Sequence, residues 1–128
     1  MGDAEDAPVD WPPSWTRASL ELAVLALVCA HGPTHGYDVA RRLRDAGLGE
    51  VKGGTLYPVL GRLEEQGLLL SHWSAGEGGP GRKVVEATRA GRRELGVRRR
   101  AWRVWTGRVA AVLSLGVGDD EEHEEEER

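Results

Sequence analysis

The order of its secondary-structure signals restricts the fold of this chain more than any other feature. Three stretches have helical spacing of apolar residues, at residues 17–30, 34–46 and 55–66, and two with strand composition follow at residues 68–74 and 83–88. Apolar residues lie on nearly every side of the first stretch, which predicts a helix buried all round. The other two helices are predicted to bury one face each: Val39, Leu43 and Ala46 in the second, and Leu56, Leu60 and Leu63 in the third.

Capping residues mark where these helices begin and end. Thr34 and Thr55 are suited to N-cap the second and third helices, because a threonine hydroxyl can accept from a free backbone N–H in the first turn. Pro58 then falls in the first turn of the third helix, where its missing N–H costs little. Gly47 and Gly67 end the two helices. The sequence therefore predicts two helices joined tightly and followed by a β-hairpin.

The C-terminal part has a longer helical pattern. Residues 89–115 carry two series of residues at heptad spacing, which predict a seam along one face of a single long helix. The series are Leu95, Trp102 and Val109, and Arg98, Trp105 and Val112. We therefore predict a mainly α fold with a small β-hairpin, divided into a flexible N-terminal lead (residues 1–16), a compact domain (17–88), a long helix (89–115) and a disordered acidic tail (116–128).

Charge is segregated along the chain. The net charge of the whole chain is −4, but residues 17–108 alone carry a net charge of +7. The surplus of carboxylates lies in residues 1–10 and 119–128. A block of like charges has no apolar face to bury, which is why the tail is predicted to be disordered. A basic body favours a polyanionic partner, and nucleic acid is the commonest such partner.

Several classes of protein are disfavoured by what the sequence contains. The longest apolar run, Leu22 to Ala30, is too short to span a membrane, which takes about 20 residues. The acidic start does not resemble an export signal, and Cys29, the one cysteine, is predicted to be buried as a small hydrophobe in a reducing cytoplasm. No catalytic triad, phosphate loop or metal-ligand spacing of histidines is recognisable. We expect a cytoplasmic protein that is not an enzyme and has no cofactor.

A helix-turn-helix followed by a hairpin suits double-stranded DNA, because a helix fits the major groove while a hairpin reaches the neighbouring backbone. The candidate DNA-binding residues on the third helix and the hairpin are Thr55, Tyr57, Pro58, Arg62, Arg82 and Lys83. Tyr57 borders the buried face of its helix, so pattern alone favours a core role as much as a DNA contact. Winged helices also bind proteins, so a protein-interaction module remains an alternative at this stage.

The sequence resembles the PadR family of bacterial transcriptional regulators over roughly residues 20–113. The resembling residues are His35-Gly36-Tyr37, Gly54-Thr55-Leu56-Tyr57-Pro58, Arg62-Leu63-Glu64, Gly67-Leu68, Trp73, Gly81-Arg82-Lys83, and Thr88 with Gly91. One departure is Val84-Val85, where the family usually has aromatic residues. Valine is still a strong strand former, so the strand prediction stands.

The resemblance implies a winged helix-turn-helix domain and a homodimer held by a single C-terminal helix, as in the short form of the family. It also implies an operator of dyad symmetry, usually repression, and in several members release from DNA by a small aromatic effector. Thr55, Tyr57 and Arg62 would then face DNA. The dimer interface would comprise Leu95, Trp102, Trp105, Val109 and Val112.

Aromatic residues outside the third helix allow more than one role. Tyr37 is interpreted as core and Trp73 as hairpin packing, whereas Trp15, Trp102 and Trp105 are candidates for binding an aromatic effector between two subunits. A small-molecule or metal sensor with weak DNA binding therefore remains a second alternative.

Overall fold

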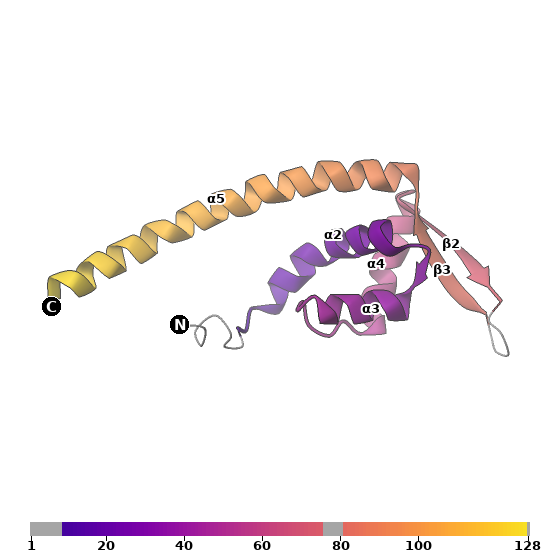
Figure 1. Cartoon of the computed structure of the whole chain (residues 1–128), viewed down its shortest axis with the longest axis horizontal. Helices are drawn as coiled ribbons and strands as arrows, with labels where there is room; N and C mark the ends of the chain where they lie inside the picture. Colours follow the sequence, from indigo (N-terminus) through magenta and orange to yellow (C-terminus); the bar gives the residue numbers. More distant parts are fainter. Residues whose placement is uncertain (1–8, 76–80, 128) are drawn as a thin grey trace. The chain divides into compact units, whose positions relative to one another are not determined.

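The computed structural model describes the backbone of residues 9–75 and 81–127, and the side chains in those ranges as far as residue 116. The chain divides between Arg92 and Arg93 into two compact units, and each is described by itself. The first unit contains three helices and a small sheet (Figure 1). The second consists of the continuing part of the last helix. Mainly helical structure with a small sheet and a long C-terminal helix confirms the predicted fold class.

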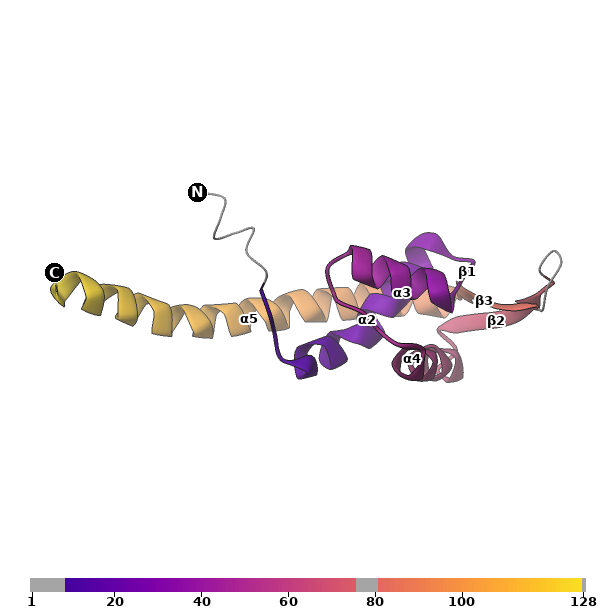
Figure 2. The same ribbon diagram turned by 90° about the horizontal axis from the view of Figure 1, so that it is seen from below.

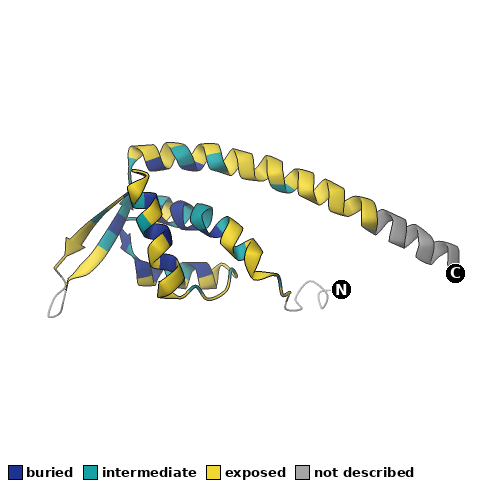
Figure 3. Ribbon diagram, turned by 180° about the vertical axis from the view of Figure 1, so that it is seen from behind, coloured by how far each residue is buried: buried dark blue, intermediate teal, exposed yellow. Residues whose placement is uncertain are grey.

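Three helices build the core of the first unit. Helices α2 (Pro13–His31), α3 (Gly36–Asp45) and α4 (Gly53–Glu65) pack against one another. Their buried residues gather where the helices meet each other and the sheet (Figure 3). The leucine and valine side chains with almost no exposed surface are Val24, Leu25, Val28, Val39, Leu43, Leu56 and Leu63. Burial of a leucine or valine contributes about 1.5–3 kcal/mol, so this cluster is the main stabilising element.

The sheet has three strands, one more than the predicted hairpin. Strands β2 (Leu69–Ser74) and β3 (Arg82–Ala87) form the hairpin, here called the wing, and β1 (Thr34–His35) pairs with the other edge of β3 (Figure 2). All pairings are antiparallel. Because Thr34 is taken up by this pairing, the N-cap of α3 is His35, and the prediction that Thr34 caps the helix is wrong. A two-residue strand has too little sequence for periodicity to reveal it.

The other two helices of this unit begin earlier than predicted, whereas α3 begins one residue later. Helix α2 starts at Pro13, and α4 starts at Gly53 with Lys52 as N-cap, so Thr55 lies inside the first turn and does not cap the helix. The backbone N–H groups of Thr55 and Leu56 both donate to the carbonyl of Lys52. Pro58 therefore lies beyond the first turn, where it removes one helical hydrogen bond.

Burial also differs from the prediction at the edges of the core. Helix α2 packs on α3, α4 and β3, which leaves Leu22 and Leu27 half-buried, so this helix is not buried on every side. Cys29 is half-buried as well. Ala46, predicted on the inner face of α3, is exposed because the helix ends at Asp45.

Thr88 and Gly91 build the junction between the wing and α5 (Arg89–Glu127). The Thr88 hydroxyl donates to the carbonyl of Gly67 (2.7 Å) and accepts from the backbone N–H of Gly91 (3.0 Å), so it ties the end of α4 to the start of α5. A Cβ at position 91 would lie 2.1 Å from the carbonyl oxygen of Leu68. Only glycine allows this approach without displacing backbone.

Helix α5 continues through residues 116–127, where the sequence predicts a disordered tail. Disorder of this segment stays a prediction, and its side chains beyond residue 116 lie outside the described part of the chain together with all of Arg128. The glutamates at residues 124–127 favour a helix by propensity, whereas Gly116 and Gly118 disfavour it, so local propensity alone does not decide this segment.

Candidate nucleic-acid interface

Helix α4 presents all four of its predicted DNA-binding residues to solvent. The side chains of Leu56, Val59, Leu60 and Leu63 are buried and orient the helix. The prediction missed Val59, which lies between Leu56 and Leu63 on the same buried face. The exposed residues of the predicted set are Thr55, Tyr57, Pro58 and Arg62. Tyr57 is 54% exposed, so it is not a core residue.

The predicted residues fall on two sides of α4. Thr55, Pro58 and Arg62 line a cavity of about 390 Å³ together with Arg17 of α2. Tyr57 points to the other side, where it lines a cavity with Arg82 and Lys83. The helical spacing explains the division, since residues 55, 58 and 62 recur at intervals of three and four whereas residue 57 does not.

The second of these cavities, here called the wing cavity, joins three elements. It has a volume of about 510 Å³ and lies between the start of α3, the exposed face of α4 and the end of the wing. Its lining residues are His35, Gly36, Tyr37, Tyr57, Trp73, Gly81, Arg82 and Lys83. The cavity thus combines two cations with three exposed aromatic side chains, a composition suited to a nucleic-acid backbone.

Tyr57 is positioned by a glycine on the neighbouring helix. A Cβ at position 36 would lie 2.9 Å from the Tyr57 hydroxyl oxygen and 3.0 Å from two of its ring carbons. Gly53 lies against the other edge of the ring, at 3.4 Å from where its own Cβ would be. The ring is therefore seated in a slot made by two glycines while remaining exposed to solvent.

His35 connects the start of α3 to the wing. Its Nδ1 accepts from the backbone N–H of Asp38 (3.3 Å) and so caps the helix. Its Nε2 lies 3.4 Å from Nη1 of Arg82 on β3. The imidazole also stacks on Tyr37, with ring centroids 6.5 Å apart and an interplanar angle of 19°. The side chain is thus held by its helix cap and by Tyr37, and its Nε2 faces Arg82 at the mouth of the cavity.

The ammonium group of Lys83 is partly neutralised within the first unit. Its Nζ lies 3.5 Å from Oε2 of Glu64, whose other carboxylate oxygen accepts from the hydroxyl of Ser71. The hydrogen bond from Ser71, with a smaller contribution from Lys83, holds the pKa of Glu64 below its usual value. A DNA phosphate that binds Lys83 would compete with Glu64 for it.

Asp38 anchors the other end of the interface. Its carboxylate accepts from the hydroxyl of Thr34 (2.7 Å) and from Nε of Arg42 (2.9 Å), and it also pairs with Arg41. The hydrogen bonds from Thr34 and Arg42 are the main causes that lower the pKa of Asp38 to about 2. Because Asp38 is nearly buried, this network holds β1 to the first turn of α3 and so holds His35 in place.

Three residues of the cavity were not predicted as functional. His35 was noted only as part of a motif, Tyr37 was interpreted as core, and Trp73 as hairpin packing. Tyr37 is 73% exposed, so the core interpretation is wrong. Trp73 is equally exposed, and a Cβ at Gly81 would lie 3.6 Å from its Cε3, so its ring packs beside the opposite strand of the hairpin as interpreted. The spacing from Val39 carried the signal for Tyr37, because two residues correspond to about 200° of rotation around a helix and place Tyr37 opposite the buried face.

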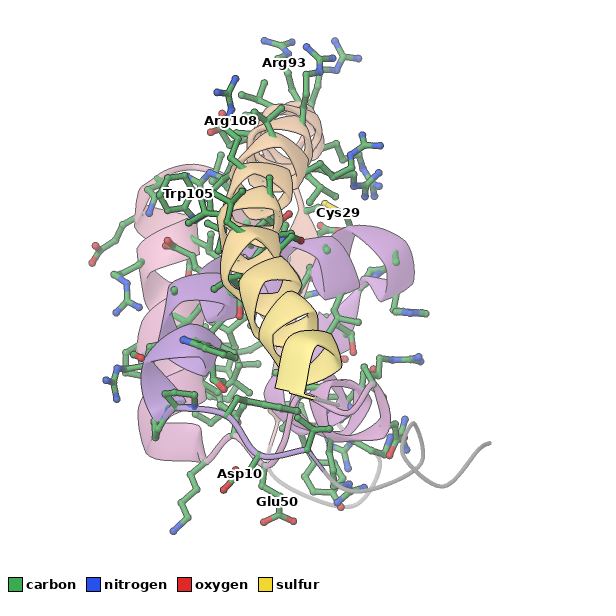
Figure 4. All side chains as sticks on the ribbon, turned by 90° about the vertical axis from the view of Figure 1, so that its left-hand side faces the viewer. Asp10, Cys29, Glu50, Arg93, Trp105 and Arg108 are labelled. Carbon is green, nitrogen blue, oxygen red and sulfur yellow. The ribbon has the colours of Figure 1, made fainter. Side chains whose placement is uncertain are left out.

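The second unit offers a different surface. Trp105 is 62% exposed, and Trp102, Val109 and Val112 are exposed as well, whereas Leu95 is already buried within a single chain. A groove of about 470 Å³ runs along α5, and Figure 4 shows Trp105 and Arg108 projecting from this helix. Its lining residues are Val97, Arg100, Ala101, Val104, Trp105 and Arg108. The groove therefore shares only Trp105 with the predicted seam. Trp15, the third predicted ligand residue, is exposed on α2.

The described part of the chain offers neither a metal centre nor a membrane-spanning helix. Within residues 9–75 and 81–116, no three histidine, cysteine, aspartate or glutamate side chains gather as metal ligands would. No helix in these residues combines the length and the apolar character that crossing a membrane requires.

Comparisons with known proteins identify a family for this chain. The sequence pattern of the "Transcriptional regulator PadR-like family" matches residues 24–97, which include the whole wing cavity. A transcriptional regulator of Mycobacterium tuberculosis is 41% identical over 85 residues, 66% of this chain and 77% of that relative. A solved PadR-family regulator from Eggerthella lenta has a TM-score of 0.72 at 35% identity, covering 79% of this chain and 87% of its own. A PadR-like regulator from Bacillus cereus has a TM-score of 0.68 at 25% identity, covering 78% and 96%.

Proposed function

The chain belongs to the PadR-like family of transcriptional regulators and is not an enzyme, and from that premise we propose that it binds double-stranded DNA as a homodimer and represses transcription from an operator of dyad symmetry. Helix α4 enters the major groove, and the wing lies along the neighbouring backbone. The proposal places the protein in the cytoplasm, where bacterial DNA lies. A small aromatic effector releases it from the operator.

The observation that carries the DNA-binding proposal is the wing cavity. Tyr57 from α4 and Arg82 and Lys83 from the wing converge on one exposed cavity, although about 25 residues of chain separate them. Phosphates are bound mainly by cations and polar groups, and bases are read by side chains of a groove-entering helix. One face of this unit therefore offers both kinds of contact.

The test is binding of an operator selected from genomic DNA, measured by fluorescence anisotropy at several salt concentrations. Arg62→Ala and Tyr57→Ala should each weaken specific binding by about 1–3 kcal/mol if the side chains contact bases. Lys83→Ala should weaken binding to every DNA sequence by a similar factor. It should also lower the slope of log affinity against log salt concentration by about one. Arg44→Ala is the matched control, because Arg44 is exposed near the far end of α3 and pairs with Asp45. Unchanged affinity in both α4 variants would remove the recognition role.

The proposal of a homodimer rests on α5. Its exposed apolar side chains include Trp102, Trp105, Val109 and Val112, and a helix with such a face is stabilised when a second helix covers it. Sedimentation of the full chain tests this directly. Trp102→Ala should weaken the dimer, whereas substitution of the exposed Arg99 on the same helix should leave it unchanged.

The effector proposal uses the same tryptophans. An indole is too wide for tight packing of two helices, so two copies of Trp102 facing each other across a dyad would leave a flat apolar gap. A planar aromatic compound stacked there gains about 0.5–1.5 kcal/mol per aromatic pair beyond area burial. Quenching of tryptophan fluorescence measures the binding, at a concentration where wild type and Trp102→Ala are both dimeric. Equal ligand affinity in the two proteins would eliminate this pocket.

A further inference from the structure

We propose that His35 and Arg82 act as a pair that grips a single phosphate of the DNA backbone at the mouth of the wing cavity. The inference rests on the proposed DNA-binding function. It adds to the DNA contacts a residue, His35, that lies on neither α4 nor the wing. The observation behind it is a contact between two side-chain N–H groups that have no acceptor between them.

The protonation of the His35 ring follows from its cap. Nδ1 accepts from the backbone N–H of Asp38, so it carries no proton. In a neutral imidazole the proton is then on Nε2, which makes Nε2 a donor. The guanidinium of Arg82 has donors only. The 3.4 Å contact between Nη1 of Arg82 and Nε2 of His35 therefore joins two donors and is not a hydrogen bond.

Two N–H groups directed at the same place call for an acceptor that both can use. Within the described part of the chain, no carboxylate or carbonyl accepts from either group. The carboxylates of the neighbouring residues are engaged elsewhere: Asp38 with Thr34, Arg41 and Arg42, and Glu64 with Ser71 and Lys83. An acceptor for both groups therefore has to come from solvent or from a bound ligand.

A phosphate of the DNA backbone fits this position. It has two unesterified oxygens close together, so one can accept from Nη1 of Arg82 while the same or the other oxygen accepts from Nε2 of His35. Its negative charge also offsets the charge of Arg82. The cavity, at about 510 Å³, is several times the size of a phosphate group and leaves room for the adjoining sugars.

The sheet register sets the spacing of the pair. His35 on β1 lies opposite Val84 on β3, and Arg82 is two residues before Val84. Since side chains two residues apart on a strand point to the same face, Arg82 and His35 form a diagonal cross-strand pair. Stacking of His35 on Tyr37 and its cap on α3 restrict the ring further. The pair is therefore held in place before DNA arrives, which lowers the entropic cost of binding.

The experiment uses full-length protein and operator duplexes in which one phosphate at a time is replaced by a neutral methylphosphonate. For the wild type, replacement at one phosphate per half-site should lower affinity about tenfold, as expected for a charge-assisted hydrogen bond. In Arg82→Ala and in His35→Asp, the unmodified duplex should bind more weakly, and replacement at that same phosphate should cost less than about twofold. All other phosphates should keep their wild-type effects.

The choice of substitution at position 35 separates the grip from the helix cap. Aspartate and asparagine are both good N-caps, so His35→Asp and His35→Asn should melt close to the wild type. Only asparagine keeps an N–H donor, so His35→Asn should retain part of the sensitivity at that phosphate, while His35→Asp should lose it. If His35→Asp fails to fold, Arg82→Ala and His35→Asn still test the pair, because Arg82 is exposed.

The outcomes distinguish this inference from the proposed function. If wild type does not bind operator duplex, the proposed function fails. If wild type binds and the same phosphate remains equally sensitive in His35→Asp and Arg82→Ala, the grip is wrong and DNA binding stands. A third outcome is that inorganic phosphate, compared with chloride at equal ionic strength, binds to the pair while no phosphate of the duplex is sensitive to the two substitutions. The pair would then bind a free anion, which would also overturn the inference.

Discussion

At the scale of single residues, the candidate nucleic-acid interface depends on the packing of Tyr57 against Gly36, which has no side chain. Gly36 leaves the space that the Tyr57 ring occupies, and the ring itself stays exposed beside Arg82 and Lys83. The motifs His35-Gly36-Tyr37 and Gly54 to Pro58, which are separate in sequence, thus meet at one contact. This contact determines where the hydroxyl of Tyr57 lies on the surface.

Gly36→Ala should reduce DNA affinity with little loss of stability. The added methyl group would lie 2.9 Å from the end of the Tyr57 side chain, and an exposed ring can rotate away without disturbing the core. Anisotropy should then report a loss comparable to that of Tyr57→Ala, while the melting temperature changes little. Gly96→Ala on α5 is the control, because nothing lies within 4 Å of where its Cβ would be and it lines neither cavity of α4. A large drop in melting temperature for Gly36→Ala would contradict this account.

The carboxylate of Asp38 is expected to make a contribution to folding stability that is lost in acid. Its pKa falls from the ordinary 3.8 to about 2 in the folded chain, so the carboxylate stabilises the fold above its unfolded pKa by about 2 kcal/mol. This contribution is lost as pH falls through about 4 toward 2. Urea unfolding at pH 7 and pH 3 should therefore show a gap between wild type and Asp38→Asn that narrows at the lower pH. Asp45→Asn, at an exposed position on the same helix, should show no such gap.

At the scale of elements, two short connections determine how the helices and the wing of the first unit are placed: the junction of the wing with α5, and the strand β1. Strand β1 brings the start of α3 alongside β3, which is why residues 35 and 82 are neighbours. Thr88 bonds to the chain at Gly67 and caps the first turn of α5 near Gly91. Both connections are made by segments of a few residues, which are too short for a periodic pattern to reveal their structure.

Gly91→Ala should destabilise the chain by about 1–3 kcal/mol, as expected when a rigid neighbour must move. The obstacle is the carbonyl oxygen of Leu68, at 2.1 Å from the added Cβ, and backbone cannot rotate aside as a side chain can. Gly96→Ala on the same helix should have the opposite sign and stabilise by up to about 1 kcal/mol, because its Cβ would meet nothing within 4 Å. Thermal unfolding of the two variants measures the contrast. Equal effects of the two substitutions would mean that the backbone at Gly91 and the carbonyl of Leu68 lie farther apart in solution.

At the scale of the whole molecule, charge is distributed so that a basic body and an acidic C-terminal segment act on DNA in opposite directions. Residues 17–108 carry +7, and residues 119–128 carry eight carboxylates and one arginine. Both belong to one chain, so the field that DNA meets is the sum of the two. We therefore expect the acidic segment to limit binding to DNA of any sequence.

Removal of residues 119–128 should tighten binding to non-specific duplex at low salt and change specific discrimination little. The effect should fade as salt rises, because the screening length falls to about 8 Å at physiological ionic strength. A variant with these acidic residues replaced by glutamine keeps the length and gives the matched control; it should behave like the truncation. Equal low-salt affinity of all three proteins would assign the segment no electrostatic role.

The sequence by itself determined the parts of this protein that depend on local periodicity. The leucine spacing of residues 56, 60 and 63 indicates which face of α4 is buried, and the exposure of Thr55, Pro58 and Arg62 follows from it. Heptad spacing and the turn composition of residues 75–82 likewise indicate a long C-terminal helix and a wing. Each of these signals is carried by residues within a few positions of one another, so no knowledge of the fold is needed.

Only the tertiary structure decided which of these elements meet. The pairing of β1 with β3, the seat of Tyr57 on Gly36 and the contact of His35 with Arg82 join residues between 21 and 51 positions apart. The exposure of Tyr37 also depends on what packs beside it. Periodicity reports which side of an element is apolar, but the partner of each side follows from the free energy of the whole packed core, which no local pattern contains.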